Sequence, residues 1–101
     1  MKGLRILLVD DEPLMRLSMV DALEAIGHDV EAAASGTGGI DAIRQRPFDL
    51  VITDLRLPGA DGLMVLKATK EQSPHTEVVV ITAHGSVETA VGAMKCGAFD
   101  Y

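Results

Sequence analysis

Three aspartates stand at the ends of two short apolar runs. Asp10 and Asp11 follow residues 6–9, and Asp54 follows residues 50–53. If both runs are neighbouring parallel strands, the three carboxylates meet at the same edge of one sheet. Clustered carboxylates repel one another unless a cation neutralises them, and hard oxygen ligands with room for water suit Mg²⁺. The sequence therefore predicts a Mg²⁺ site beside a reactive aspartate.

Apolar runs and helical stretches alternate along the chain. Alternation with short links predicts right-handed strand–helix–strand units and an α/β fold with a doubly wound parallel sheet. Proline favours the first turn of a helix and aspartate favours its N-cap, so Pro13 and Asp61 mark two helix starts. We expect strands over residues 5–9, 28–33, 49–53 and 77–82, helices over 13–26, 38–46, 61–72 and 87–96, and a fifth strand opening at 99–101. The first helix should bury Leu14, Leu17, Val20, Leu23 and, at its end, Ile26.

The composition limits the class of protein. A chain of 101 residues with 48% apolar residues forms one small domain with an aliphatic core. The net charge of −6 and the scattered basic residues argue against direct nucleic-acid binding. No run reaches the roughly 18–20 apolar residues of a membrane span, and the amino terminus lacks a signal-peptide pattern. These features predict a cytoplasmic location and no membrane partner.

Four ordered motifs resemble those of response-regulator receiver domains. They are the pair Asp10-Asp11, the segment from Asp54 to Gly62, the pair Thr82-Ala83, and residues 95–101 (Lys-Cys-Gly-Ala-Phe-Asp-Tyr). The resemblance covers the whole chain and implies a single receiver domain over residues 1–101. It also implies a flavodoxin-like sheet with strand order 2-1-3-4-5, an order that is known for this fold.

The resemblance assigns a role to each matching residue. Asp54 is the implied phosphoacceptor. The implied direct Mg²⁺ ligands are Asp11, Asp54 and the backbone carbonyl of Arg56, and Asp10 is implied to contact the ion mainly through water. The implied phosphoryl-contact and switch residues are Thr82, Ala83 and Tyr101. We also hypothesise that Arg56 and His84, which flank the expected phosphoryl group, tune its hydrolysis.

The same resemblance implies partners. A sensor histidine kinase donates the phosphoryl group, and the chain is an acceptor rather than an enzyme. Residues 55–59 and 82–91 look like those of nitrogen-regulator-type receivers, which activate transcription with sigma-54 polymerase. Those proteins carry an ATPase module and a DNA-binding module after the receiver. Neither module lies within the 101 residues, so direct contact of this chain with DNA is not expected.

The sequence departs from the family pattern at its carboxyl end. The family places a lysine three positions after the aromatic that matches Tyr101, and this sequence stops before it. Most of the fifth strand and all of the fifth helix are also absent. We expect the natural protein to continue beyond Tyr101. Without those elements the apolar edge of the fourth strand would favour pairing with another chain, so a homodimer or other self-association is expected.

The sequence also allows other roles for these residues. Asp10 and Asp11 could cap the Pro13 helix, Asp54 could be an ordinary turn residue, and Thr82 could be a plain strand end. Tyr101 could be a packing residue without a switch role, and His84 could be a surface loop residue.

At the level of function, one alternative is a docking module that works without phosphorylation. Another is a Mg²⁺-dependent phosphatase of the haloacid-dehalogenase type. Such proteins carry Asp-x-Asp after the first strand, where this chain has Asp10-Asp11-Glu12.

Overall fold

A parallel sheet of four strands forms the centre of the described part of the molecule. The computed structural model describes residues 3–81 and 97–98. Within them the strands follow the order β2-β1-β3-β4, which confirms the first four positions of the predicted order. The strands are β1 (Arg5–Val9), β2 (Asp29–Ala33), β3 (Leu50–Asp54) and β4 (Glu77–Ile81), and the helices are α1 (Pro13–Ala25), α2 (Gly36–Gln45) and α3 (Gly62–Gln72).

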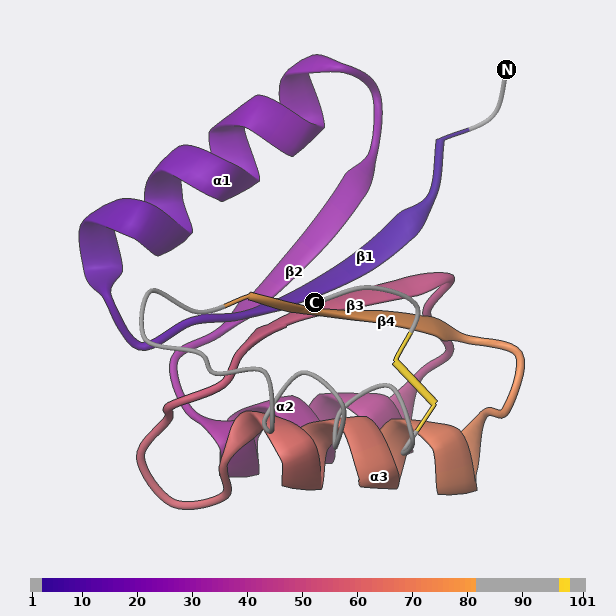
Figure 1. Cartoon of the computed structure of the whole chain (residues 1–101). Coiled ribbons are helices and arrows are strands. Elements are labelled where there is room, and N and C mark those ends of the chain that lie inside the picture. Colours follow the sequence, from indigo (N-terminus) through magenta and orange to yellow (C-terminus); the bar gives the residue numbers. More distant parts are fainter. Residues whose placement is uncertain (1–2, 82–96, 99–101) are drawn as a thin grey trace.

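Within residues 3–81, the helices lie on both faces of the sheet. α1 lies on one face, and α2 and α3 lie side by side on the other (Figure 1). The strand register places Val9 beside Thr53 and Asp54 beside Ile81. The carboxyl ends of β1, β3 and β4 therefore reach the same edge of the sheet, as parallel pairing requires.

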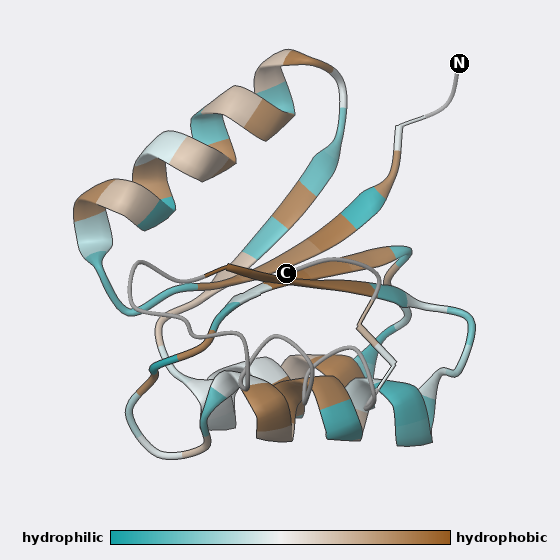
Figure 2. Cartoon of the chain, viewed as in Figure 1, coloured by the Kyte–Doolittle hydropathy of each residue, from teal (hydrophilic) through white to brown (hydrophobic). Residues whose placement is uncertain are grey.

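The main core lies between the sheet and the pair α2–α3. Alternate strand residues point toward these helices, and the side chains of Val65 and Leu66 on α3 complete the layer with no exposed surface. The strands form the hydrophobic band that crosses Figure 2. The strand residues of this core are Leu7, Val9, Val51, Val78 and Val80. Burial of such side chains stabilises a fold by roughly 1.5–3 kcal/mol each.

The predicted burial of α1 is wrong. No residue of α1 is buried, and 73% of Leu14 and 59% of Leu17 are exposed, while Val20 and Leu23 are half-buried. Hydrophobic residues are spread around the helix instead of forming one stripe (Figure 2). Spacing in the sequence predicts which residues share a helix face, but not how closely the helix approaches the sheet. In the described part of the chain, α1 packs mainly against β2 and β1.

Each of the described helices α1, α2 and α3 follows a residue that caps it. Glu12, Ser35 and Asp61 accept hydrogen bonds from the backbone N–H groups of residues 15, 38 and 64, respectively. Such caps satisfy N–H groups that lack a partner inside the helix. The start at Pro13 and the cap at Asp61 confirm the predictions, whereas α2 starts two residues earlier than expected. Among the described helices, none has both the length and the apolar character to cross a bilayer.

The remaining predicted elements lie outside the described residues. The helix expected over residues 87–96, the end of the fourth strand at Thr82 and the fifth strand expected from residue 99 all fall in ranges 82–96 and 99–101.

The two faces of α3 provide a test of the packing. The Leu66→Ala substitution removes a fully buried side chain and should lower the free energy of unfolding by about 2–5 kcal/mol. Met64→Ala on the same helix removes a side chain that is 52% exposed and should change it far less. Urea unfolding followed by circular dichroism measures both. Equal destabilisation by the two substitutions would contradict this description of the core.

Candidate metal centre

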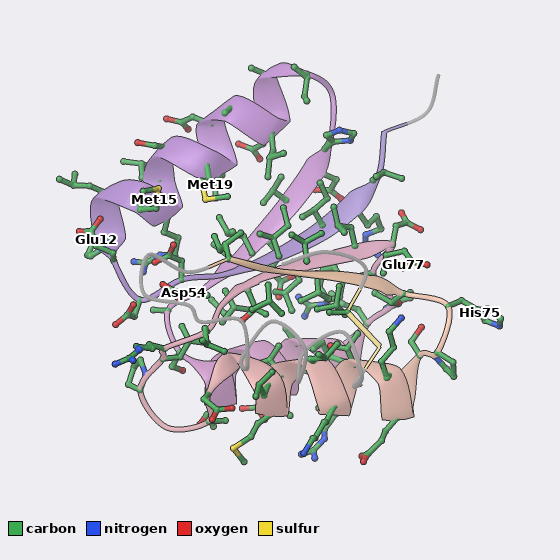
Figure 3. All side chains as sticks on the ribbon, in the orientation of Figure 1. Glu12, Met15, Met19, Asp54, His75 and Glu77 are labelled. Carbon is green, nitrogen blue, oxygen red and sulfur yellow. The ribbon has the colours of Figure 1, made fainter. Side chains whose placement is uncertain are left out.

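The three aspartates that the sequence singled out lie together. Asp10, Asp11 and Asp54 each offer a carboxylate oxygen, and these oxygens all lie within 4.8 Å of one another. Asp10 is buried, Asp54 is half-buried and Asp11 is exposed. Figure 3 shows Asp54 at the end of the sheet near Glu12, whereas His75 and Glu77 lie toward the opposite end. The arrangement combines a fixed inner carboxylate with two that solvent can reach.

The backbone of the sheet brings these residues together. Asp54 is the last residue of β3, and Asp10 directly follows β1, the neighbouring strand. The N–H of Asp10 donates to the carbonyl of Ala33 at 3.1 Å, which extends the pairing of β1 with β2 by one residue. The acidic pair is therefore held at the sheet edge before the chain turns into α1.

Asp10 occupies an unusual environment for a carboxylate. Only 2% of the residue is exposed, and its Oδ1 accepts a hydrogen bond of 2.9 Å from the N–H of Glu12. Burial raises the pKa of Asp10 above its ordinary value of 3.8, and the charges of Asp54 and Asp11 raise this pKa further. The hydrogen bond from Glu12 opposes that rise. The site therefore favours anything that supplies positive charge to Asp10, whether a proton or a cation.

The segment after β3 turns back over Asp54. The N–H of Arg56 donates to Oδ1 of Asp54 at 3.3 Å, and the hydroxyl of Thr53 donates to the Asp54 carbonyl at 3.0 Å. The backbone of Arg56 thus lies beside the carboxylate, as a metal-ligating carbonyl would require. Ligation by that carbonyl stays a prediction, as does the role of the exposed Arg56 side chain in hydrolysis.

Two glycines let the loop around Asp54 pack closely. A Cβ at Gly62 would overlap the carbonyl oxygen of Asp54, and a Cβ at Gly36 would overlap the carbonyl oxygen of Ala60. Gly62 therefore packs its Cα against the backbone of Asp54, and Gly36 does the same for the loop between β3 and α3. These contacts are backbone contacts, so flexible side chains cannot move aside to relieve them.

The structure does not test every predicted site residue. Four of them lie outside the described residues, namely Thr82, Ala83, His84 and Tyr101. Conversely, sequence reasoning missed Arg16, whose Nη1 donates to the backbone carbonyl of Asp10 at 2.8 Å. No local motif indicates that contact. The available signal is that Arg16 lies four residues after the cap Glu12, one helical turn into α1, from where a long side chain can reach back.

A hollow of about 300 Å³ lies away from the acidic cluster. It is formed by residues from the ends of α2 and α3 and from the segment between α2 and β3, and it contains none of the three aspartates. Its lining residues are Ile43, Arg44, Gln45, Arg46, Pro47, Phe48, Val51, Thr69, Gln72, Ser73 and Thr76. The acidic cluster is therefore a site on the sheet edge and not the wall of this hollow.

Comparison with known proteins identifies the family. The model of the response regulator receiver domain matches residues 6–101. This chain belongs to that family. The match includes all three aspartates and the segments that carry the other predicted site residues of the receiver domain.

The relatives of this receiver domain include transcriptional regulators. It is 42% identical over 96 residues to the transcriptional regulatory protein ZraR of Escherichia coli O157:H7, covering 95% of this chain and 22% of that protein. It is 37% identical over 94 residues to the DNA-binding transcriptional regulator NtrC of Klebsiella pneumoniae, covering 93% and 20%. The chain spans about a fifth of the length of these relatives. The predicted likeness to nitrogen-regulator-type receivers is confirmed.

A solved structure shares the fold of this receiver domain. It is a response regulator protein from Burkholderia pseudomallei with a phosphorylated aspartic acid, calcium ion and citrate. The TM-score is 0.91 at 27% identity, and the match covers 96% of this chain and 57% of that one. The flavodoxin-like fold predicted for the receiver domain is thereby confirmed for the described strands.

The contact between Gly62 and Asp54 can be tested by adding one methyl group. Alanine favours a helix by about 1 kcal/mol over glycine, so propensity alone would stabilise a Gly62→Ala variant. The overlap with the Asp54 backbone should outweigh this gain and lower the free energy of unfolding by about 1–3 kcal/mol. Thermal or urea unfolding gives the value.

Gly38→Ala is the matched control. A Cβ there lies 3.2 Å from Oγ of Ser35 and 3.7 Å from Cβ of Ala33, which are side-chain atoms. That substitution requires only the Ser35 side chain to move by a small amount, so it should lower the free energy of unfolding far less than Gly62→Ala. If Gly62→Ala were no less stable than Gly38→Ala, the proposed close packing on Asp54 would be wrong.

The raised pKa of Asp10 predicts a pH dependence in the metal-free receiver domain. Since its folded-state pKa lies above the unfolded value, the stability contributed by protonated Asp10 is complete below the ordinary pKa of 3.8. This contribution is lost as the pH rises through the folded-state pKa. Asp10→Asn keeps an oxygen for the Glu12 N–H and removes the charge, so it should raise the melting temperature at neutral pH in EDTA. The difference in melting temperature between Asp10→Asn and the parent should become smaller toward pH 4.

Asp41→Asn on the exposed surface of α2 provides the control, because it removes the same charge away from the cluster. A melting temperature of Asp10→Asn at or below that of the parent at neutral pH would show that charge repulsion at Asp10 does not destabilise the metal-free domain.

Proposed function

We propose that this receiver domain accepts a phosphoryl group onto Asp54 from a phosphohistidine of a sensor histidine kinase. The observation that carries the proposal is the position of Asp54 at the end of β3, within 4.8 Å of two further carboxylates. Membership of the receiver family supports it. The half-buried Asp54 combines a fixed backbone with a carboxylate that a large donor can approach.

The donor set fits a divalent cation. Asp10, Asp11 and Asp54 provide three hard oxygen ligands, too few to fill an octahedral Mg²⁺ site, which leaves positions for water and for a phosphoryl oxygen. We propose that these residues, with the Arg56 carbonyl, hold Mg²⁺. When bound, the ion supplies positive charge that offsets the repulsion between the carboxylates and the incoming phosphoryl group. The calcium ion of the Burkholderia protein is consistent with a divalent site in this fold.

The residues of the chain then perform the transfer. A carboxylate oxygen of Asp54 attacks phosphorus while the bond from phosphorus to the donor imidazole breaks, and the imidazole nitrogen retains the bonding electron pair. The products are an acyl phosphate on Asp54 and a free histidine on the kinase. The N–H of Arg56 holds one Asp54 oxygen in place, so the carboxylate is already oriented before transfer.

We further propose that phosphorylation controls a transcriptional output module of the protein to which this domain belongs. The support is that the relatives ZraR and NtrC are transcriptional regulators and are about five times as long as the matched segment. Thr82, Ala83 and Tyr101 would transmit the change, and we propose separately that the domain forms a homodimer or otherwise self-associates. Those residues lie outside the described part of the chain, so these roles rest on the family alone.

A single experiment tests the central chemistry. The receiver domain is treated with acetyl phosphate and Mg²⁺ and its intact mass is measured. We expect the mass to increase by one phosphoryl group, and we expect Asp54→Asn to abolish the increase because the amide is not a nucleophile. Omitting Mg²⁺ should slow it strongly.

Asp61→Asn is the matched control. Asp61 is an exposed carboxylate near the site, and asparagine caps a helix as well as aspartate does, so this variant should be phosphorylated like the parent. A parent chain that gains no mass, or an Asp54→Asn variant that gains as much as the parent, would refute the assignment. The first result would favour the alternative of a docking module that acts without phosphorylation.

A further inference from the structure

We propose that Arg16 is a positioning residue that holds the turn between β1 and α1 in the shape that receives a divalent cation. This inference rests on the proposed function, because it assumes that Asp10, Asp11 and Asp54 bind the ion. Arg16 itself contacts none of the three carboxylates through a hydrogen bond or ion pair among the described residues. Its action would pass through the backbone of Asp10.

Arg16 is connected to both ends of the turn. Its Nη1 donates to the carbonyl of Asp10 at 2.8 Å, and its backbone N–H donates to the carbonyl of Glu12 at 2.9 Å. Its side chain is half-buried, so the guanidinium contact is partly shielded from water. The three residues from Asp10 to Glu12, which include Asp11, are thereby clamped between the end of β1 and the first turns of α1.

Asp10 is fixed at three separate atoms. Its N–H donates to Ala33, its carbonyl accepts from Arg16, and its Oδ1 accepts from the N–H of Glu12. Two of these bonds use only a backbone group of the partner, namely the carbonyl of Ala33 and the N–H of Glu12. Any residue supplies such a carbonyl, and any residue other than proline supplies such an N–H. The bond from Arg16 uses a side chain. It is therefore the one of these three restraints on Asp10 that depends on the identity of the partner residue.

The charge of Arg16 does not explain its position. A cation in the first turns of a helix opposes the helix dipole, and a cation near the acidic cluster opposes the binding of a second cation. Both electrostatic effects disfavour arginine here. Its hydrogen bond to Asp10 has the opposite effect, because it pre-organises two ligands before the ion arrives. Replacing Arg16 by a neutral residue should therefore weaken Mg²⁺ binding if Arg16 positions the ligands, and strengthen it if Arg16 acts only through its charge.

The test compares Mg²⁺ affinities of unphosphorylated variants. MgCl₂ is titrated into the chain, and the amide resonance of Glu12, whose N–H donates to Asp10, is followed by NMR. We expect Arg16→Met to bind Mg²⁺ roughly ten-fold more weakly, at the lower end of the about 10–100-fold loss typical for partners that orient metal ligands. Loss of a repelling charge alone would strengthen binding instead.

Two variants separate positioning from other effects. Arg44→Met removes the same charge from an exposed position on α2 and should leave the affinity unchanged. Arg16→Lys keeps the charge but replaces the guanidinium fork with a compact ammonium. It should bind Mg²⁺ more weakly than the parent and more tightly than Arg16→Met, and it remains informative if Arg16→Met does not fold. Melting curves in EDTA identify temperatures at which each variant is folded.

The outcomes distinguish this inference from the proposed function. Parent-like Mg²⁺ affinity in folded Arg16→Met would overturn the inference, even if that variant melts at a lower temperature, because a purely structural role changes only the melting. If Arg16→Met does not fold, parent-like affinity in Arg16→Lys overturns it. A parent chain that binds no Mg²⁺, or binds it equally after Asp11→Asn, would instead refute the metal site itself.

Discussion

Mutual repulsion among three carboxylates is the constraint on which this structure depends. Like charges about 4 Å apart near a protein surface oppose each other by on the order of a few kcal/mol. The oxygens of Asp10, Asp11 and Asp54 nevertheless lie within 4.8 Å of one another. They remain there because β1 and β3 are adjacent strands whose pairing fixes where each chain ends. The stability of the parallel sheet offsets the repulsion, so the core indirectly holds the acidic cluster together at its edge.

Much of this edge could be predicted from the sequence, because the causes are local or topological. Apolar runs of strand length separated by helical stretches imply parallel strands, and parallel strands place their carboxyl ends together. That rule places Asp10 and Asp54 at the same edge of the sheet, and the strand order implied by the family resemblance makes their strands neighbours. Helix starts at Pro13 and Asp61 were also predictable, since a cap needs only the residue itself and the N–H groups that follow it.

Other features depend on tertiary contacts that no local pattern encodes. The apolar spacing of α1 predicted burial of Leu14 and Leu17, but burial is set by the elements that face a helix, and in the described structure these are mainly β1 and β2. The packing of Gly62 on Asp54 and the reach of Arg16 back to Asp10 follow from the path of the backbone. From the sequence alone, Gly62 is equally consistent with an ordinary turn, and Arg16 is equally consistent with a solvated surface position.

The unequal exposure of the three aspartates suits the proposed transfer from a donor protein. A phosphohistidine on another protein cannot enter a deep cavity, so the accepting carboxylate must lie at an accessible edge. An accessible carboxylate is normally mobile, however, and poorly oriented for in-line attack. Here Asp10 is buried and held at three atoms, while Asp54 is half-buried with one oxygen bonded to the N–H of Arg56. If Asp54 is the phosphoacceptor as proposed, the chain keeps this carboxylate open to a large donor and places the rigidity in the residues behind it.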